Sequence, residues 1–209
     1  MHKGIDDTGG ELCCQPIHRS NRHYGFVGLN NVLSGGIKIC PTTFDIPLLM
    51  KKIHVLFVCM GNICRSPTAQ GVFRALLQRE GLADRILTDS AGTIAYHVGE
   101  PPDRRATATA AKRGVDLSDL RARRAKAEDF ERFDYVVAMD RANYGDLLEI
   151  CPPGYEDRLY LFLDFAPHRP EDEVPDPYYG GAAGFDRVFD LIEDASQGLL
   201  QHILDNHAA

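Results

Sequence analysis

Cys59 and Arg65 are separated by five residues, and Ser66 follows directly. A thiolate, the planar fork of an arginine and a hydroxyl group together suit a tetrahedral dianion such as a phosphoryl group. Attack of the thiolate on phosphorus would give a phosphocysteine intermediate, with the equatorial oxygens held by backbone amides and by Arg65. The bare spacing leaves one alternative, a buried cysteine with an arginine nearby by chance.

The segments on either side of these residues would place them around an anion. Residues 53–58 form an apolar run that predicts a buried strand, and residues 66–77 have the pattern of a helix. Ser66 can cap this helix, and Pro67 suits its first position, where a missing N–H has no partner to lose. The strand-to-helix turn would then direct amides and a helix N-terminus at the anion, and both favour the thiolate form of Cys59.

The stretch 55–67 resembles the signature of the low-molecular-weight protein tyrosine phosphatases. The similarity covers about residues 51–205, in the family's order and spacing, and continues through residues 89–93, 96–103, 133–140 and 176–180. The resemblance implies an enzyme that hydrolyses protein tyrosine phosphate and needs no metal and no cofactor.

Three catalytic roles follow from this resemblance. Cys59 would be the nucleophile, Arg65 the phosphate clamp and Asp176 the general acid, which protonates the leaving phenolate and later takes a proton from water. Pro177 restricts Asp176 to an extended backbone. Asp140 is a weaker candidate for the acid, and we interpret it as a residue that ends a strand. The residues expected to bind phosphate or support the loop are Met60, Gly61, Asn62, Ile63, Cys64, Ser66 and Ser90.

Three tyrosines are expected to shape the substrate pocket. By the resemblance, Tyr96 would form an aromatic wall beside the substrate ring, with Tyr178 and Tyr179 at the opposite rim. Half-buried packing is the alternative role for each. Related enzymes that dephosphorylate arginine carry a small polar residue at the position of Ile63, so isoleucine favours tyrosine phosphate.

Two loop residues are expected to do more than line the pocket. Asn62 should adopt the left-handed backbone conformation, which asparagine tolerates better than most residues. The family often braces it with a serine, here Ser90, and a downstream histidine, but residues 119–120 are aspartate and leucine, which leaves the bracing open. By the resemblance, Cys64 would form a reversible disulfide with Cys59; a small apolar filler is the alternative.

Strand and helix patterns alternate along the chain. Strands are expected at 53–58, 85–90, 133–139 and 158–162, and helices at 66–77, 106–113, 143–150 and 184–204. The alternation predicts a single α/β domain whose four-stranded parallel sheet carries helices on both faces, with the phosphate-binding loop after strand 1. The basic run 121–126 predicts a solvated face, with docking of an acidic phosphoprotein as the alternative.

Composition is consistent with a cytoplasmic enzyme. The formal charge of −7 favours neither nucleic acid nor an anionic membrane as a partner. No apolar run approaches the ~20 residues that cross a bilayer. The six cysteines lack the spacing of a zinc site or a disulfide framework. We expect the phosphatase domain at 50–209 and, at 1–49, an extension that is disordered or an upstream-start artefact.

Other functions on this fold stay open as alternatives. A thioredoxin-coupled arsenate reductase would need further cysteines, and Cys151 is the only distal one after residue 50. A protein arginine phosphatase is disfavoured by Ile63. A binding module without catalysis would lose the acid that Asp176 supplies. The expected partner is a tyrosine-phosphorylated protein, by analogy a bacterial tyrosine kinase, and the enzyme is expected to be a monomer or a weak dimer.

Overall fold

The computed structural model describes residues 51–178 and 181–207. The predicted extension at 1–49 and the predicted rim residue Tyr179 lie outside these residues. No helix in the described ranges is both long and apolar enough to cross a membrane.

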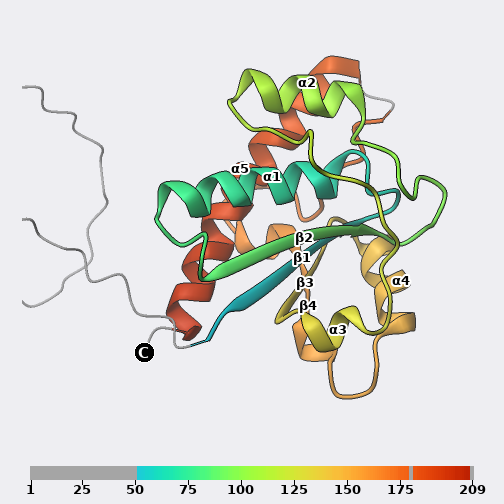
Figure 1. Cartoon of the computed structure of the whole chain (residues 1–209), viewed down its shortest axis with the longest axis vertical. Coiled ribbons are helices and arrows are strands. Elements are labelled where there is room, and N and C mark those ends of the chain that lie inside the picture. Colours follow the sequence, from blue (N-terminus) through green and yellow to red (C-terminus); the bar gives the residue numbers. More distant parts are fainter. Residues whose placement is uncertain (1–50, 179–180, 208–209) are drawn as a thin grey trace, which may run out of the picture. The chain divides into compact units, whose positions relative to one another are not determined.

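Four parallel strands form one sheet (Figure 1). They are β1 (Ile53–Cys59), β2 (Ile86–Gly92), β3 (Tyr135–Ala138) and β4 (Leu159–Leu161). Their order is β2-β1-β3-β4, so the chain crosses over from β2 to β3 past the central strand β1. This confirms the predicted α/β class with a parallel sheet.

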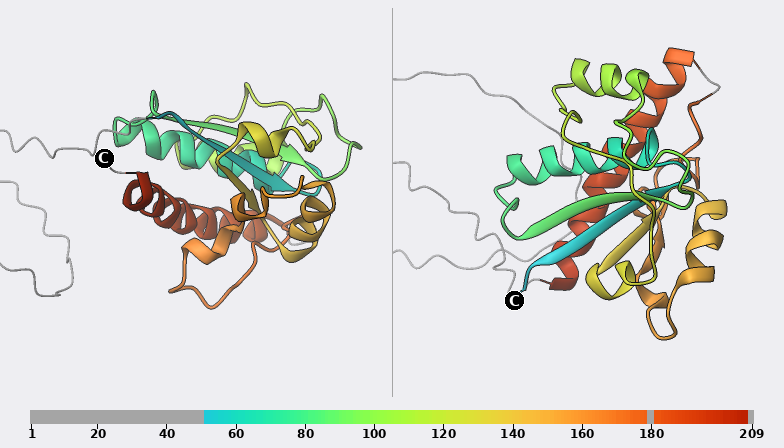
Figure 2. Two further views of the ribbon diagram at one scale, coloured as in Figure 1. Left: turned by 90° about the horizontal axis from the view of Figure 1, so that it is seen from below. Right: turned by 45° about the vertical axis from the view of Figure 1, so that its right-hand side comes forward.

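Helices cover both faces of the sheet (Figures 1 and 2). They are α1 (Arg65–Arg79), α2 (Arg104–Lys112), α3 (Asp129–Arg132), α4 (Arg141–Ile150) and α5 (Gly181–His207), with single 3₁₀ turns η1 (Glu156–Arg158) and η2 (Phe162–Phe165). Helices α1 and α5 lie side by side on one face, and α3 and α4 contribute to the core on the other. A strand buried on both faces reads as a continuous apolar run, which is the pattern of β1.

The two faces of β1 belong to different hydrophobic clusters. Val55 and Phe57 pack toward α1 and α5, whereas Leu56 and Val58 pack toward α3 and α4. The ring of Phe57 meets Phe73 of α1 edge-on, with the ring centroids 5.7 Å apart. Because β1 is fixed from both sides, its last residue, Cys59, has a fixed position at the carboxyl edge of the sheet.

Several element boundaries differ from the predicted ones. The strand predicted at 158–162 is shorter, because η1 and η2 take residues at both of its ends. Helix α2 begins at Arg104, since the side chain of Asp103 accepts a hydrogen bond from the Arg105 N–H at 2.7 Å. Helix α1 begins at Arg65, with Cys64 at the capping position, so Ser66 is not its cap.

Candidate active site

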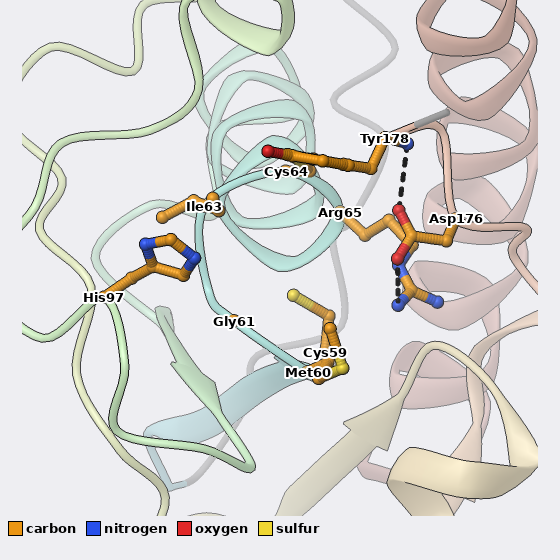
Figure 3. A pocket seen from close by; sticks show the side chains of 9 residues that line it. All are labelled: Cys59, Met60, Gly61, Ile63, Cys64, Arg65, His97, Asp176 and Tyr178. Carbon is orange, nitrogen blue, oxygen red and sulfur yellow. Dashed lines mark hydrogen bonds and ion pairs between the residues drawn. The ribbon is translucent and has the colours of Figure 1, made fainter. Parts of the chain in front are cut away.

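The segment between β1 and α1 forms the floor of a pocket at the carboxyl edge of the sheet (Figure 3). Cys59 is the last residue of the strand and Arg65 the first of the helix, and both side chains are buried. The pocket is lined by Cys59, Met60, Gly61, Ile63, Cys64, Arg65, His97, Asp176 and Tyr178. The sequence-predicted catalytic residues therefore meet in one place.

Two polar groups of the loop and of α1 contact the sulfur of Cys59. The backbone N–H of Asn62 donates to Sγ at 3.3 Å, and the hydroxyl of Ser66 lies 3.1 Å from it. A negative charge on the sulfur would be stabilised by these contacts and by the N-terminus of α1. Ser66 therefore contacts the cysteine sulfur from the loop position predicted for it, while the helix cap that the sequence also suggested for Ser66 is not observed.

Asn62 holds the loop in shape from inside. Its backbone has φ of 55°, the left-handed conformation that was expected. Its side-chain amide donates to Ser66 Oγ at 2.8 Å and to Ser90 Oγ at 2.9 Å. Its Oδ1 accepts from the backbone N–H of Arg123 at 2.9 Å. The position left open by the missing histidine is thus filled by a main-chain amide, and every polar group of the buried amide has a partner.

The basic run at 121–126 is only in part the solvated face that was predicted, because one of its arginines is held in ion pairs. Arg123 pairs with Asp89, with Nη2 and Oδ2 2.8 Å apart, and with the buried carboxylate of Asp129 at 2.9 Å. These ion pairs fix the segment whose amide binds Asn62. Its neighbours Arg121, Arg124 and Lys126 are exposed, as predicted.

Gln70 of α1 completes the hydrogen-bond chain. Its amide nitrogen donates to the Thr88 carbonyl at 3.3 Å, so its oxygen is free to accept from the hydroxyl of Ser90 at 2.7 Å. Ser90 then offers its lone pairs to Asn62. Gly92, at the end of β2, packs directly against the backbone of the phosphate-binding loop. A Cβ at this position would lie 2.7 Å from the carbonyl oxygen of Met60, so only glycine fits.

Arg65 is held by two carboxylates and one carbonyl. Its Nη1 donates to the carboxylate of Asp140 and, at 3.1 Å, to the carbonyl of Val174. Its Nη2 lies 3.6 Å from Oδ2 of Asp176. Burial opposes the charge of this side chain, which is 4% exposed, but the negative charges of Cys59, Asp140 and Asp176 outweigh it and raise the pKa of Arg65. The guanidinium stays charged and oriented.

Asp140 has a larger role than the predicted one of ending a strand. One of its oxygens receives Arg65, and the other accepts the backbone N–H of Asn143 at 2.7 Å, which caps α4. Sequence reasoning missed its contact with Arg65. The available signal was a carboxylate directly after the third strand, at the same edge of the sheet as Cys59.

Asp176 lies beside Arg65 on one side of the pocket (Figure 3). Its side chain is 40% exposed, and it accepts the backbone N–H of Tyr178 at 3.0 Å. The segment that carries it is attached to the sheet, because the Val174 N–H donates to the carbonyl of Met139 at 2.8 Å. The acid loop is thereby fixed relative to β3, while its carboxylate remains open to substrate.

The rim of the pocket differs in part from the expected one. Tyr178 lines the pocket, and the guanidinium of Arg105 lies 4.9 Å from the centre of its ring. Tyr96 is 82% exposed and does not belong to the lining. Its neighbour His97 lines the pocket instead, with Nδ1 2.7 Å from Oε2 of Glu100. The similarity at 96–103 thus indicated the loop that borders the pocket, but the side chain of this loop that lines it is His97.

Cys64 lies in the same lining as Cys59. Burial, and then the negative charges of Asp103, Cys59 and Asp176, raise the pKa of the Cys64 thiol to about 12. Cys64 is therefore a neutral thiol at physiological pH. Over the described ranges, no group of three or more histidine, cysteine or acidic side chains is arranged to hold a metal ion.

Comparison with known proteins shows which family has this sequence and this fold. The family model described as low molecular weight phosphotyrosine protein phosphatase matches residues 54–209. This chain belongs to that family. A relative from Synechocystis sp., named as a putative low molecular weight protein-tyrosine-phosphatase, is 48% identical over 149 residues, which span 71% of this chain and 94% of the relative.

Two further comparisons agree with this assignment. The low molecular weight phosphotyrosine protein phosphatase of Schizosaccharomyces pombe is 42% identical over 156 residues, which span 74% of this chain and 99% of that protein. The crystal structure of a protein tyrosine phosphatase from Entamoeba histolytica matches with a TM-score of 0.72 and 41% identity, over 74% of this chain and 99% of that one. This phosphatase therefore spans nearly the whole length of its relatives.

Proposed function

We propose that this phosphatase hydrolyses protein tyrosine phosphate with Cys59 as nucleophile, Arg65 as phosphate clamp and Asp176 as general acid and base. The observation that carries the proposal is the meeting of these three side chains in one pocket, at the start of a helix whose preceding loop directs the Asn62 amide at the cysteine sulfur. Each supplies a different requirement of phosphoryl transfer: the attacking group, the charge neutralisation and the proton.

In the first step, the Cys59 thiolate attacks phosphorus while the bond to the tyrosine oxygen breaks. The loop amides and the Arg65 guanidinium bind the equatorial oxygens, and Asp176 gives its proton to the departing phenolate. In the second step, water attacks the phosphocysteine and the Asp176 carboxylate takes a proton from it. Inorganic phosphate leaves and the thiolate is restored.

The pocket lining supports an aromatic leaving group. Tyr178 and His97 lie on different sides of the phosphate loop, and the apolar side chain of Ile63 lies between them (Figure 3). A flat ring can pack against such walls with its phosphate on the loop below. A serine phosphate is too short to reach the loop and fill the same walls. This supports tyrosine phosphate as the substrate over arginine or serine phosphate.

Hydrolysis of a phosphotyrosine peptide with a chelator present tests the assignment. Cys59→Ser should abolish turnover, and Asp176→Asn should lower kcat by about 100-fold or more. With p-nitrophenyl phosphate, whose leaving group needs less protonation, Asp176→Asn should lose less. Arsenate reduction coupled to thioredoxin, together with little phosphatase activity, would overturn the proposal in favour of the reductase.

We also propose that Cys64 protects Cys59 from irreversible oxidation. Peroxide would transfer one oxygen to the Cys59 thiolate, giving a sulfenic acid and hydroxide. The Cys64 thiol would then displace that oxygen as water and form a disulfide, which a dithiol reductant reopens. The raised pKa of the Cys64 thiol keeps it protonated, which disfavours direct attack of Cys64 on peroxide. Peroxide-treated wild type should recover activity with dithiothreitol, whereas Cys64→Ala should not.

We further propose that residues 50–209 form the complete catalytic domain, and that 1–49 is an extension the enzyme does not need. Deleting 1–49 should leave kcat and KM within about twofold; loss of activity would contradict this.

The three cysteines in the described ranges are free, which supports a reducing, cytoplasmic location. The proposed substrate is a tyrosine-phosphorylated protein such as a bacterial tyrosine kinase. The phosphatase itself is proposed to be a monomer or a weak dimer.

A further inference from the structure

Large apolar side chains are exposed on the segments that line the active-site pocket or that adjoin these segments in the chain. The described residues expose seven large hydrophobic side chains, and five of them come from the segments that border this pocket. We name these five the apolar collar: Met60, Ile94, Tyr96, Val98 and Tyr178. Each is between 40% and 82% exposed. Apolar surface gathered in one place marks an interaction site more often than scattered exposed residues do.

Backbone and ring contacts join the collar to the phosphate loop. The Ile94 N–H donates to the carbonyl oxygen of Met60 at 3.1 Å, so the two residues are neighbours. The ring of Tyr96 packs edge-on against His97 with centroids 4.8 Å apart, and His97 lines the pocket. Met60 and Tyr178 both belong to the lining itself (Figure 3). The collar is therefore continuous with the site that holds the phosphorylated residue.

Two charged groups beside the collar have partners within the chain. Glu100 lies 2.7 Å from His97, and Asp103 binds the guanidinium of Arg105 at 2.9 Å while also capping α2. Hydrogen bonding to Arg105 holds the pKa of Asp103 below its ordinary value. These two carboxylates are therefore already engaged, and a ligand beside His97 and Tyr178 meets apolar side chains next to them.

A protein substrate necessarily brings its own chain to this surface. With the phosphotyrosine in the pocket, residues one and two positions away lie within about 7 Å of it along an extended chain. Resting on the function proposed above, we infer that the apolar collar binds the residues that flank the phosphotyrosine, and that it selects flanks with large apolar side chains.

The test compares catalytic efficiency on three phosphotyrosine peptides of equal length. Their flanks are leucine and isoleucine, serine, or glutamate, and p-nitrophenyl phosphate reports on the pocket without flanks. The wild type should prefer the apolar over the serine flanks by at least about tenfold. Ile94→Ser and Val98→Ser should each reduce that ratio by about fivefold, since covering a half-exposed aliphatic side chain is worth about half of its full burial.

Leu87→Ser is the matched control. Leu87 is exposed to a similar extent, but it lies near the amino end of β2, away from the strand ends that carry the pocket. For Leu87→Ser, the ratio of catalytic efficiency on the peptide with apolar flanks to that on the peptide with serine flanks should equal the wild-type ratio. A wild-type ratio near one, with p-nitrophenyl phosphate still hydrolysed, would overturn the inference and leave the proposed function intact. Absence of hydrolysis with every substrate would instead remove the proposed function.

Two other outcomes would also overturn the inference. Sedimentation as a dimer that Ile94→Ser makes monomeric, with equal activity on all three peptides, would assign the collar to a second copy of this chain. Binding to phosphatidylglycerol vesicles that Ile94→Ser abolishes, again with equal activity on the peptides, would assign it to a membrane surface.

Discussion

Replacing Asp140 by asparagine tests whether this carboxylate orients Arg65 for phosphate binding. One oxygen of Asp140 receives Arg65 and the other receives the N–H of Asn143. Asparagine offers one acceptor and one donor in the same places. It can cap α4 as well as aspartate does, but its NH₂ group then faces the Arg65 guanidinium, and two donors meet.

The magnitude follows from the lost contact. A hydrogen bond to a charged group contributes about 1.5–3 kcal/mol. The Val174 carbonyl and Asp176 still hold Arg65, so we expect a loss at the lower end, near 1.5–2 kcal/mol. At 1.36 kcal/mol per decade, Asp140→Asn should lower kcat/KM for p-nitrophenyl phosphate by about 10- to 30-fold. Inhibition by inorganic phosphate, which needs the same guanidinium, should weaken in parallel.

Steady-state kinetics and urea unfolding of two variants decide the result. Asp140→Ser keeps a hydroxyl that can cap α4 and removes the carboxylate without placing a donor against Arg65. It should therefore lose activity, but less than Asp140→Asn. If both variants are folded and retain kcat/KM within twofold of wild type, Arg65 does not depend on Asp140 and the reasoning is wrong.

Two further predictions concern stability, measured by urea titration. Gly198→Ala should destabilise the protein by about 1–3 kcal/mol, because its Cβ would overlap the Phe165 carbonyl oxygen. Gly145→Ala, where a Cβ meets nothing within 4 Å, should stabilise the protein by about 0.5–1 kcal/mol; shifts of the same sign would contradict this. Burial opposes the ionisation of Asp134, but the hydrogen bonds from Lys51 and from the His54 N–H, together with the charges of these two residues, outweigh burial and lower the pKa of Asp134. Its contribution to stability is therefore present above the unfolded pKa of about 3.9 and is lost as pH falls through the folded pKa. Asp134→Asn should be less stable than wild type at pH 7, and this difference should shrink as the pH falls; a difference independent of pH would refute this.

The parts of the site that sequence could predict are local in the chain. The strand, the loop and the first helix follow one another within 27 residues, from Ile53 to Arg79, so spacing and flanking patterns are enough to place Cys59 beside Arg65. The parallel sheet was predictable for a similar reason, because each crossover carries its own periodic helix.

The contacts that sequence could not predict join distant segments. Arg65 and Asp140 are 75 positions apart, and Asn62 meets the amide of Arg123 across 61. A main-chain donor leaves no trace in residue type, so the contact of Asn62 with the Arg123 amide had no signal in the sequence, whereas its contact with Ser90 was predicted. The presence of His97 in the lining had no sequence signal for another reason: adjacent residues in a loop follow no period that would assign a side chain to a direction.

The bracing of the phosphate loop has a consequence for competition inside a cell. Because Asn62, Ser90 and Gln70 fix the loop before any ligand arrives, little ordering entropy opposes the binding of an anion. A cradle that is ready for substrate is equally ready for free phosphate, sulfate or vanadate, all of which have the same tetrahedral shape. Free phosphate in the cell therefore acts as a standing competitor, and the contacts outside the cradle decide which phosphoproteins displace it.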